Sequence, residues 1–288
     1  MTVDERLSYE ARVRPYLAVL AGLAGVLLVG ASIMQLTGPH TKVSELTLDL
    51  ITAHKRYPLD LIAAVVNALG SLALAATLSF LYGAARARNE QLQPFVKFLA
   101  IGGAVVAGIS GIAYAVVIHD KAGQFVSGGD QSYQQAHHLA TSSGLLAMQL
   151  VGQAAALVLA IGICLVSLNA MRVGLLTRFM GYLGIFAGVL VLFQITQVPV
   201  VQAYWLLALA YLFTGRWPTG VPPAWRSGRA EKWPSSQELR EQRAAAAAGR
   251  NGAREKPTPK PEPAPEAVGA TAARTRTSTP KRKRKRRR

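Results

Sequence analysis

The chain has 288 residues, of which 51% are hydrophobic, and a formal net charge of +17. Residues 1–215 hold 12 Lys/Arg and 9 Asp/Glu, whereas residues 216–288 hold 20 and 6, which indicates two physically different regions. The single cysteine, Cys164, excludes an intramolecular disulfide and a CxxC metal or redox motif.

Residues 1–15 are predicted to form a cytoplasmic N-terminal segment. Asp4, Glu5 and Glu10 dilute the positive charge that a signal peptide carries at its start. The apolar stretch after Pro15 is about 20 residues long, which is enough to cross a bilayer. The sequence therefore predicts that this stretch is retained as the first membrane span.

Six apolar segments have the length that a hydrocarbon core about 30 Å thick requires. The last two form one run of about 36 residues, too long for a single crossing, and Pro199 interrupts it where a tight hairpin is predicted. The fold class is therefore an all-α integral membrane protein, a bundle of about six transmembrane helices within residues 16–215. The predicted spans are 16–36, 61–83, 95–118, 139–168, 179–196 and 199–214.

Small residues recur at four-residue spacing in several of these segments. Such spacing lets helices approach closely in lipid, so close helix contacts are predicted there. The positions are Gly103/Ala107/Gly111, Gly152/Ala156/Ala160 and Gly184/Gly188.

Lys and Arg residues in the short loops predict the orientation, because cytoplasmic loops carry an excess of them. With the N-terminus inside, eight fall on the cytoplasmic side and four on the other, so both termini are predicted in the cytoplasm. The Ala/Gly/Val/Arg-rich composition suggests a bacterial plasma membrane.

Two outer loops follow from this topology. In the first, Val43, Leu46, Leu50 and Ile51 have the spacing of a short interfacial helix, with a plain loop as the alternative. The second, residues 121–135, is rich in Gly, Ser and Gln and is predicted to be irregular and mobile.

Residues 216–250 are predicted to form a juxtamembrane segment, with Trp217, Trp225 and Trp233 at the headgroup level, and then a short helix. Residues 251–288 are predicted to be a disordered polybasic tail. Its last eight residues can neutralise phosphates of anionic lipid or nucleic acid, or they are a solvated charge run. The anion-binding residues are Lys281, Arg282, Lys283, Arg284, Lys285, Arg286, Arg287 and Arg288.

Histidine and amide side chains gather on the outer side. They predict an outward-open polar pocket, in which His119 and His137 or His138 are candidate metal ligands or pH-sensitive groups. The alternative is that amides near water only form hydrogen bonds between helices. No cofactor motif is found. The candidate pocket residues are Asn67, His119, His137, His138, Gln149, Gln153, Gln194, Gln197 and Gln202.

The string Gly108-Ile109-Ser110-Gly111 is similar to the GxSG string around the nucleophile of rhomboid proteases, which also have a core of six helices. A serine nucleophile needs a base within hydrogen-bond reach. His119 is about 13 Å further along the same helix, and no predicted span carries a histidine at bilayer depth. The sequence therefore argues against an intramembrane enzyme.

The sequence favours a non-enzymatic membrane scaffold or accessory protein whose tail docks on anionic lipid or nucleic acid. The alternative is a small-molecule binding or permeation protein that uses the outer polar pocket, and an intramembrane enzyme is third. The expected partners are membrane lipids, anionic headgroups, nucleic acid or the ribosome at the tail, and a protein partner or second copy.

Overall fold

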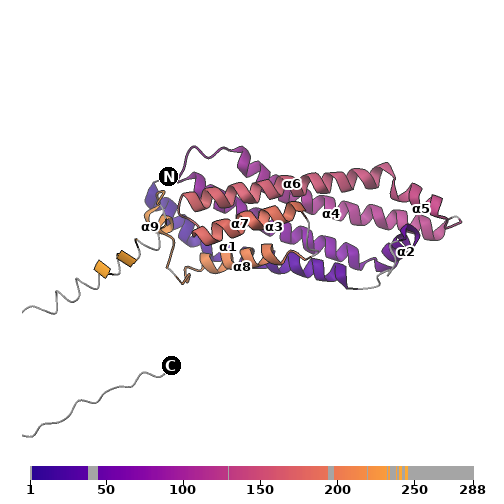
Figure 1. Ribbon diagram of the computed structural model, residues 1–288, viewed down its shortest axis with the longest axis horizontal. Coiled ribbons are helices and arrows are strands. Elements are labelled where there is room, and N and C mark those ends of the chain that lie inside the picture. The colour runs from indigo at the N-terminus through magenta and orange to yellow at the C-terminus, as the bar shows by residue number, and fades with distance from the viewer. Residues whose placement is uncertain are drawn as a thin grey trace, which may run out of the picture. The chain divides into compact units, whose positions relative to one another are not determined.

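A computed structural model describes residues 2–37, 45–128, 130–193, 198–218, 220–231, 233, 238, 240–241 and 244–245. The described residues form helices and no strands, which confirms the all-α prediction. Residues 1–233 form one compact unit, which contains all the helices described below, and residues 234–288 form a second (Figure 1). The predicted tail, including Lys281–Arg288, lies outside the described residues.

Four helices are long and apolar enough to cross a membrane: α1 (Val3–Leu36), α3 (Leu59–Arg86), α4 (Phe95–Ser127) and α6 (Ser143–Arg172). Their outward faces carry exposed large apolar side chains, such as Leu23, Leu69 and Ile109. An apolar surface of this extent is typical of helices in contact with lipid. The protein is therefore membrane-embedded.

The last two apolar segments form shorter helices, α7 (Arg178–Phe193) and α8 (Val200–Phe213). At 16 and 14 residues they are about 24 and 21 Å long, less than the hydrocarbon core. Pro199 immediately precedes α8, and the two helices pack against each other as a hairpin. In Figure 1 they lie beside the half of the bundle that contains α9 (Pro223–Ser227).

The six longer helices form a closed ring, in which each packs on the next in the order α1, α3, α4, α6, α7 and α8, and α8 returns to α1. Helices α4 and α6 approach each other closely. A Cβ added at Gly103 would lie 2.5 Å from the Leu159 nitrogen, and one at Gly162 would lie 2.6 Å from the Ala100 Cα. The predicted close contact is confirmed at Gly103, whereas Gly111 has no atom of another residue near its missing side chain.

Helix α1 begins 13 residues earlier than the predicted span at Tyr16. Thr2 and Glu5 form a capping box: the Glu5 N–H donates to the Thr2 hydroxyl over 3.3 Å, and the Thr2 N–H donates to the Glu5 carboxylate over 2.8 Å. This reciprocal pair starts the helix in a polar segment. Pro15 consequently lies inside the helix.

Both of the loops predicted to be outer contain helices. The alternative of a short helix in the first loop is confirmed by α2 (Leu46–Arg56). The prediction of an irregular second loop is wrong, because α4 continues to Ser127 and α5 (Tyr133–Ala140) follows. Phe125 of α4, Leu139 of α5 and Leu50 of α2 are buried in one small core. This burial outweighs the low helix propensity of the local Gly and Ser residues.

The segment after α8 folds back onto the bundle. Trp225 in α9 is only 3% exposed, and its indole N–H donates to the Leu175 carbonyl over 3.0 Å. Gly174, at φ +81°, lets the chain approach so closely that a Cβ there would overlap the Glu231 carbonyl. Trp225 therefore packs inside the protein, and its position at the headgroup level stays a prediction. The compact unit continues past residue 215 to Trp233.

Candidate functional site

The two ends of the first unit differ in charge. The basic end, formed by the start of α1, the α3–α4 and α6–α7 connections and the segment after α8, has eleven described Lys/Arg and five Asp/Glu. The histidine end is formed by residues 45–60 and 119–142. It has three described Lys/Arg and five Asp/Glu, together with the four described histidines. The described residues of the long helices between these ends carry no Lys, Arg, Asp or Glu.

A buried ion pair organises the basic end. Arg88 donates to both carboxylate oxygens of Glu10, over 2.7 and 2.6 Å, and the two side chains are 0% and 4% exposed. Its remaining N–H groups donate to the Ala224 and Ala84 carbonyls, and its guanidinium lies over the Trp225 ring. All five donors of Arg88 are used, which is the arrangement of a structural group. In the sequence, Arg88 is only one of the basic loop residues that predict the orientation, because no sequence pattern connects it with Glu10.

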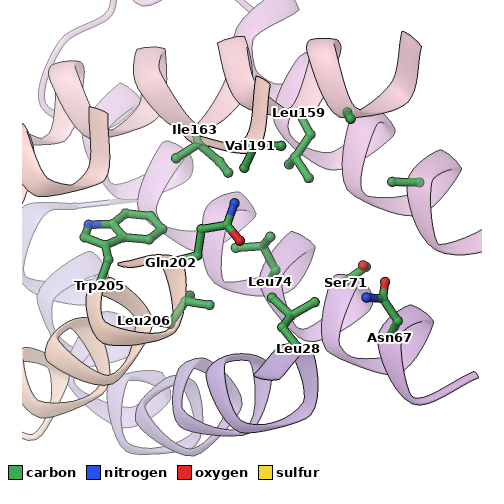
Figure 2. Close-up of a pocket in the computed structure, with 12 residues that line it drawn as sticks. Leu28, Asn67, Ser71, Leu74, Leu159, Ile163, Val191, Gln202, Trp205 and Leu206 are labelled. Carbon is green, nitrogen blue, oxygen red and sulfur yellow. The ribbon is translucent and has the colours of Figure 1, made fainter. Parts of the chain in front are cut away.

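A partly open cavity of about 150 Å³ lies within the ring of six helices, beside the end of α7 and the start of α8 (Figure 2). It exists there because α7 and α8 end part-way along the bundle, whereas their neighbours continue. Its wall is mostly apolar and includes Leu28, Leu74, Leu159, Ile163, Val191, Trp205 and Leu206. Three polar side chains, Asn67, Ser71 and Gln202, complete the lining.

The two amides of the lining are half-buried. Within the described part of the chain, the carboxamides of Asn67 and Gln202 have no hydrogen-bonding partner, and Ser71 has none either. Figure 2 shows the Gln202 amide directed into the cavity and Asn67 beside Ser71. An amide that faces apolar walls without a partner costs about 1–3 kcal/mol. We therefore expect water or a polar ligand between these groups.

The structure brings together only some of the predicted pocket residues. Asn67 and Gln202 share the central cavity, whereas Gln149 and Gln153 are exposed and line a separate depression between α4 and α6, with Tyr114. Gln194 and Gln197 lie outside the described residues. The sequence missed Ser71 and Trp205, because a serine and a tryptophan within an apolar helix carry no signal of a cavity.

The predicted histidines lie at the histidine end. The His119 ring stacks on Tyr57 with ring centroids 3.6 Å apart, and His54 lies parallel to it at 5.6 Å. His137 and His138 lie in α5, where His137 is next to Tyr133. The described residues contain no group of three His, Cys, Asp or Glu that could hold a metal ion.

Ser110, in the string similar to the rhomboid nucleophile, donates its hydroxyl to the Ala107 carbonyl of the same helix over 3.1 Å. It also lies next to Gly152 of α6, whose absent side chain leaves room for it. Both contacts are those of a packing residue in a helix interface.

Comparisons with known protein families, with curated proteins and with solved structures gave no match.

Proposed function

We propose that the protein is a membrane-embedded binding protein for a small uncharged molecule, which occupies the central cavity. The observation that carries this proposal is the pair of carboxamides, Asn67 and Gln202, that face the cavity without a partner among the described residues. About 150 Å³ accommodates a molecule the size of benzene, or about five water molecules. The described residues that line the cavity include no charged side chain, so a charged ligand would lose its hydration without compensation from them.

The lining defines the ligand's chemistry. Each carboxamide can both donate and accept a hydrogen bond, and the Ser71 hydroxyl adds one of each. The opposite walls are leucine and isoleucine side chains and the Trp205 ring. A compact or flat apolar body with one or two hydrogen-bonding groups fits this combination, which is typical of small-molecule sites.

Within this proposal the basic end faces the cytoplasm. The excess of Lys and Arg there supports this orientation by the positive-inside rule. The α7–α8 hairpin then provides the fifth and sixth crossings of a multi-pass protein in a bacterial plasma membrane, with both termini inside. Asn67 lies on the outer side of Ser71 and Leu74 along α3, so the polar part of the cavity is the part nearer the outer surface.

The binding proposal is tested with 4-fluorophenol, a neutral probe of this size. The full chain in phosphatidylcholine nanodiscs should broaden the probe's ¹⁹F resonance saturably, beyond the partitioning seen with empty nanodiscs. Replacing Asn67→Leu and Gln202→Leu together should weaken binding by about thirtyfold, since two hydrogen bonds of about 1 kcal/mol each are lost.

The matched control is the pair Gln149→Leu and Gln153→Leu, which removes two amides from the separate depression and should leave the probe bound. Equal binding by parent and cavity variant would show that the probe only partitions into lipid, and the proposal would be wrong.

The charge of the basic end favours a second proposal: the polybasic tail docks on anionic surfaces in the cytoplasm. Glu231 is hydrogen-bonded to Val173 at the basic end, so the chain continues towards the tail from that end. Attraction to an anionic leaflet contributes about 1 kcal/mol of binding free energy per basic residue near its surface. Lipid is the nearest such surface for a tethered tail, and nucleic acid is the other.

The tail proposal is tested by deleting Lys281–Arg288. The full chain in neutral nanodiscs should bind phosphatidylserine vesicles and RNA more tightly than the deleted chain, with a difference that disappears at high salt. Equal association of the two chains at low salt would contradict docking. The relative strength of the two ligands identifies the surface.

A further inference from the structure

A groove on the lipid-facing side of the bundle lies between α1 and α3 and has a volume of about 600 Å³. Its floor is the outward stripe of α3, where Ala76, Ser79 and Gly83 have small side chains. Leu17 and Val13 of α1 form an apolar wall, and a Cβ at Gly83 would meet no atom within 4 Å. The groove is therefore open along its length and apolar at its deeper end.

The mouth of the groove is cationic. Arg6 and Lys97 line it at the basic end. Arg6 donates one N–H to the Ala87 carbonyl over 2.6 Å, which holds the guanidinium at the mouth, and its other donors have no partner among the described residues. Lys97 is exposed and has no ion pair with any described residue. Glu10 also lines the groove, but its charge is balanced by the buried Arg88.

The groove spans one leaflet. Arg6 and Leu17 are eleven residues apart on α1, a rise of about 16 Å, which is about half of a hydrocarbon core of about 30 Å. The cationic groups thus lie at the depth of headgroups, and the apolar walls at the depth of acyl chains. Basic pockets between transmembrane helices at this depth suit anionic lipid headgroups.

We infer that this groove binds one anionic phospholipid of the leaflet at the basic end, with its phosphate between Arg6 and Lys97 and an acyl chain over Gly83 and Ala76. The charge complementarity of the mouth selects an anionic over a zwitterionic headgroup. The inference is independent of the cavity and of the tail, since none of the groove residues belongs to either.

The experiment is native mass spectrometry of the full chain released from nanodiscs that contain equal amounts of phosphatidylglycerol and phosphatidylcholine. The parent protein should retain one phosphatidylglycerol in preference to phosphatidylcholine. Lys97→Gln should reduce this preference about fivefold, the effect of one basic residue near the headgroups. Gly83→Leu should remove the retained lipid, because the new side chain fills the floor.

Gly102→Leu is the matched control, since Gly102 on α4 also has open space around it and lies outside the groove. It should retain lipid as the parent does. Deletion of Lys281–Arg288 should leave the preference unchanged, and millimolar glycerol phosphate should not displace the lipid.

Three results would overturn the inference: equal retention of the two lipids by the parent, unchanged retention in Gly83→Leu, or loss of the preference when the tail is deleted. The last would assign the attraction to the tail. Displacement by glycerol phosphate would show that only the headgroup is bound and that no acyl chain occupies the groove. This result would also contradict the inference.

Discussion

The polar side chains of the basic end are hydrogen-bonded within the protein, whereas the half-buried amides of the cavity have no described partner. At the basic end Arg88 uses all five N–H donors on Glu10, Ala224 and Ala84, and the Trp225 indole donates to Leu175. Around the cavity the amides of Asn67 and Gln202 have no partner in the described residues.

This difference separates structure from function. Buried polar groups in proteins are nearly always hydrogen-bonded, so a fully paired network is explained by folding, whereas unpaired groups need another explanation. The paired groups fasten the chain after α8 to the bundle. The amides of Asn67 and Gln202 lie around one cavity, and the proposed ligand would supply their partners.

The largest expected effect comes from breaking the paired network. Glu10→Ala leaves the guanidinium of Arg88 buried without its counter-charge, which costs about 3–5 kcal/mol. The free energy of unfolding in SDS, followed by circular dichroism, should fall by this amount. Glu90→Ala, at an exposed carboxylate, should change it little. A loss under about 1 kcal/mol for Glu10→Ala would mean that the pair is not buried as described.

The next effect tests the close packing that frames the cavity. Gly103→Ala inserts a methyl group 2.5 Å from the backbone of Leu159, so α4 and α6 must separate. Overpacking of this kind costs about 1–3 kcal/mol. Gly102→Ala, one residue away with open space, should be neutral or stabilising by up to about 1 kcal/mol. Similar behaviour of the two variants in the same unfolding assay would contradict the predicted helix contact.

An effect of the same size, confined to one segment, is expected after α8. Trp225→Phe keeps a ring over Arg88 but leaves the buried Leu175 carbonyl without its donor, a loss of about 1–3 kcal/mol. Trp217→Phe, where the indole N–H has no described partner, should cost less. Limited proteolysis after residue 215 should be faster in Trp225→Phe only. Equal rates in both variants would show that the indole hydrogen bond does not hold the segment.

The sequence predicted the features that depend on local pattern. Long apolar runs gave α1, α3, α4 and α6, and Pro199 marked the hairpin, because span length and proline chemistry are local properties. Contacts between distant residues were not predictable. Glu10 and Arg88 are 78 positions apart in the sequence. The small core of Leu50, Phe125 and Leu139 forms although the chain around residues 121–135 is rich in Gly and Ser.

The candidate site was predicted in part for the same reason. Asn67 and Gln202 stood out as amides within apolar runs, and the structure places both on one cavity. Gln149 and Gln153 stood out equally, and they face outward. Which face of a helix is directed toward the bundle interior depends on the neighbouring helices. The sequence alone did not show that α7 and α8 end beside this cavity.

The most direct test measures stability and binding in the same variant, Asn67→Leu combined with Gln202→Leu. If the amides serve a ligand, their removal takes no hydrogen bond from the fold, so the free energy of unfolding without ligand should be unchanged or higher. Binding of 4-fluorophenol should fall at the same time. A loss of stability of more than about 2 kcal/mol, with binding retained, would show that the amides serve the fold and would contradict the account.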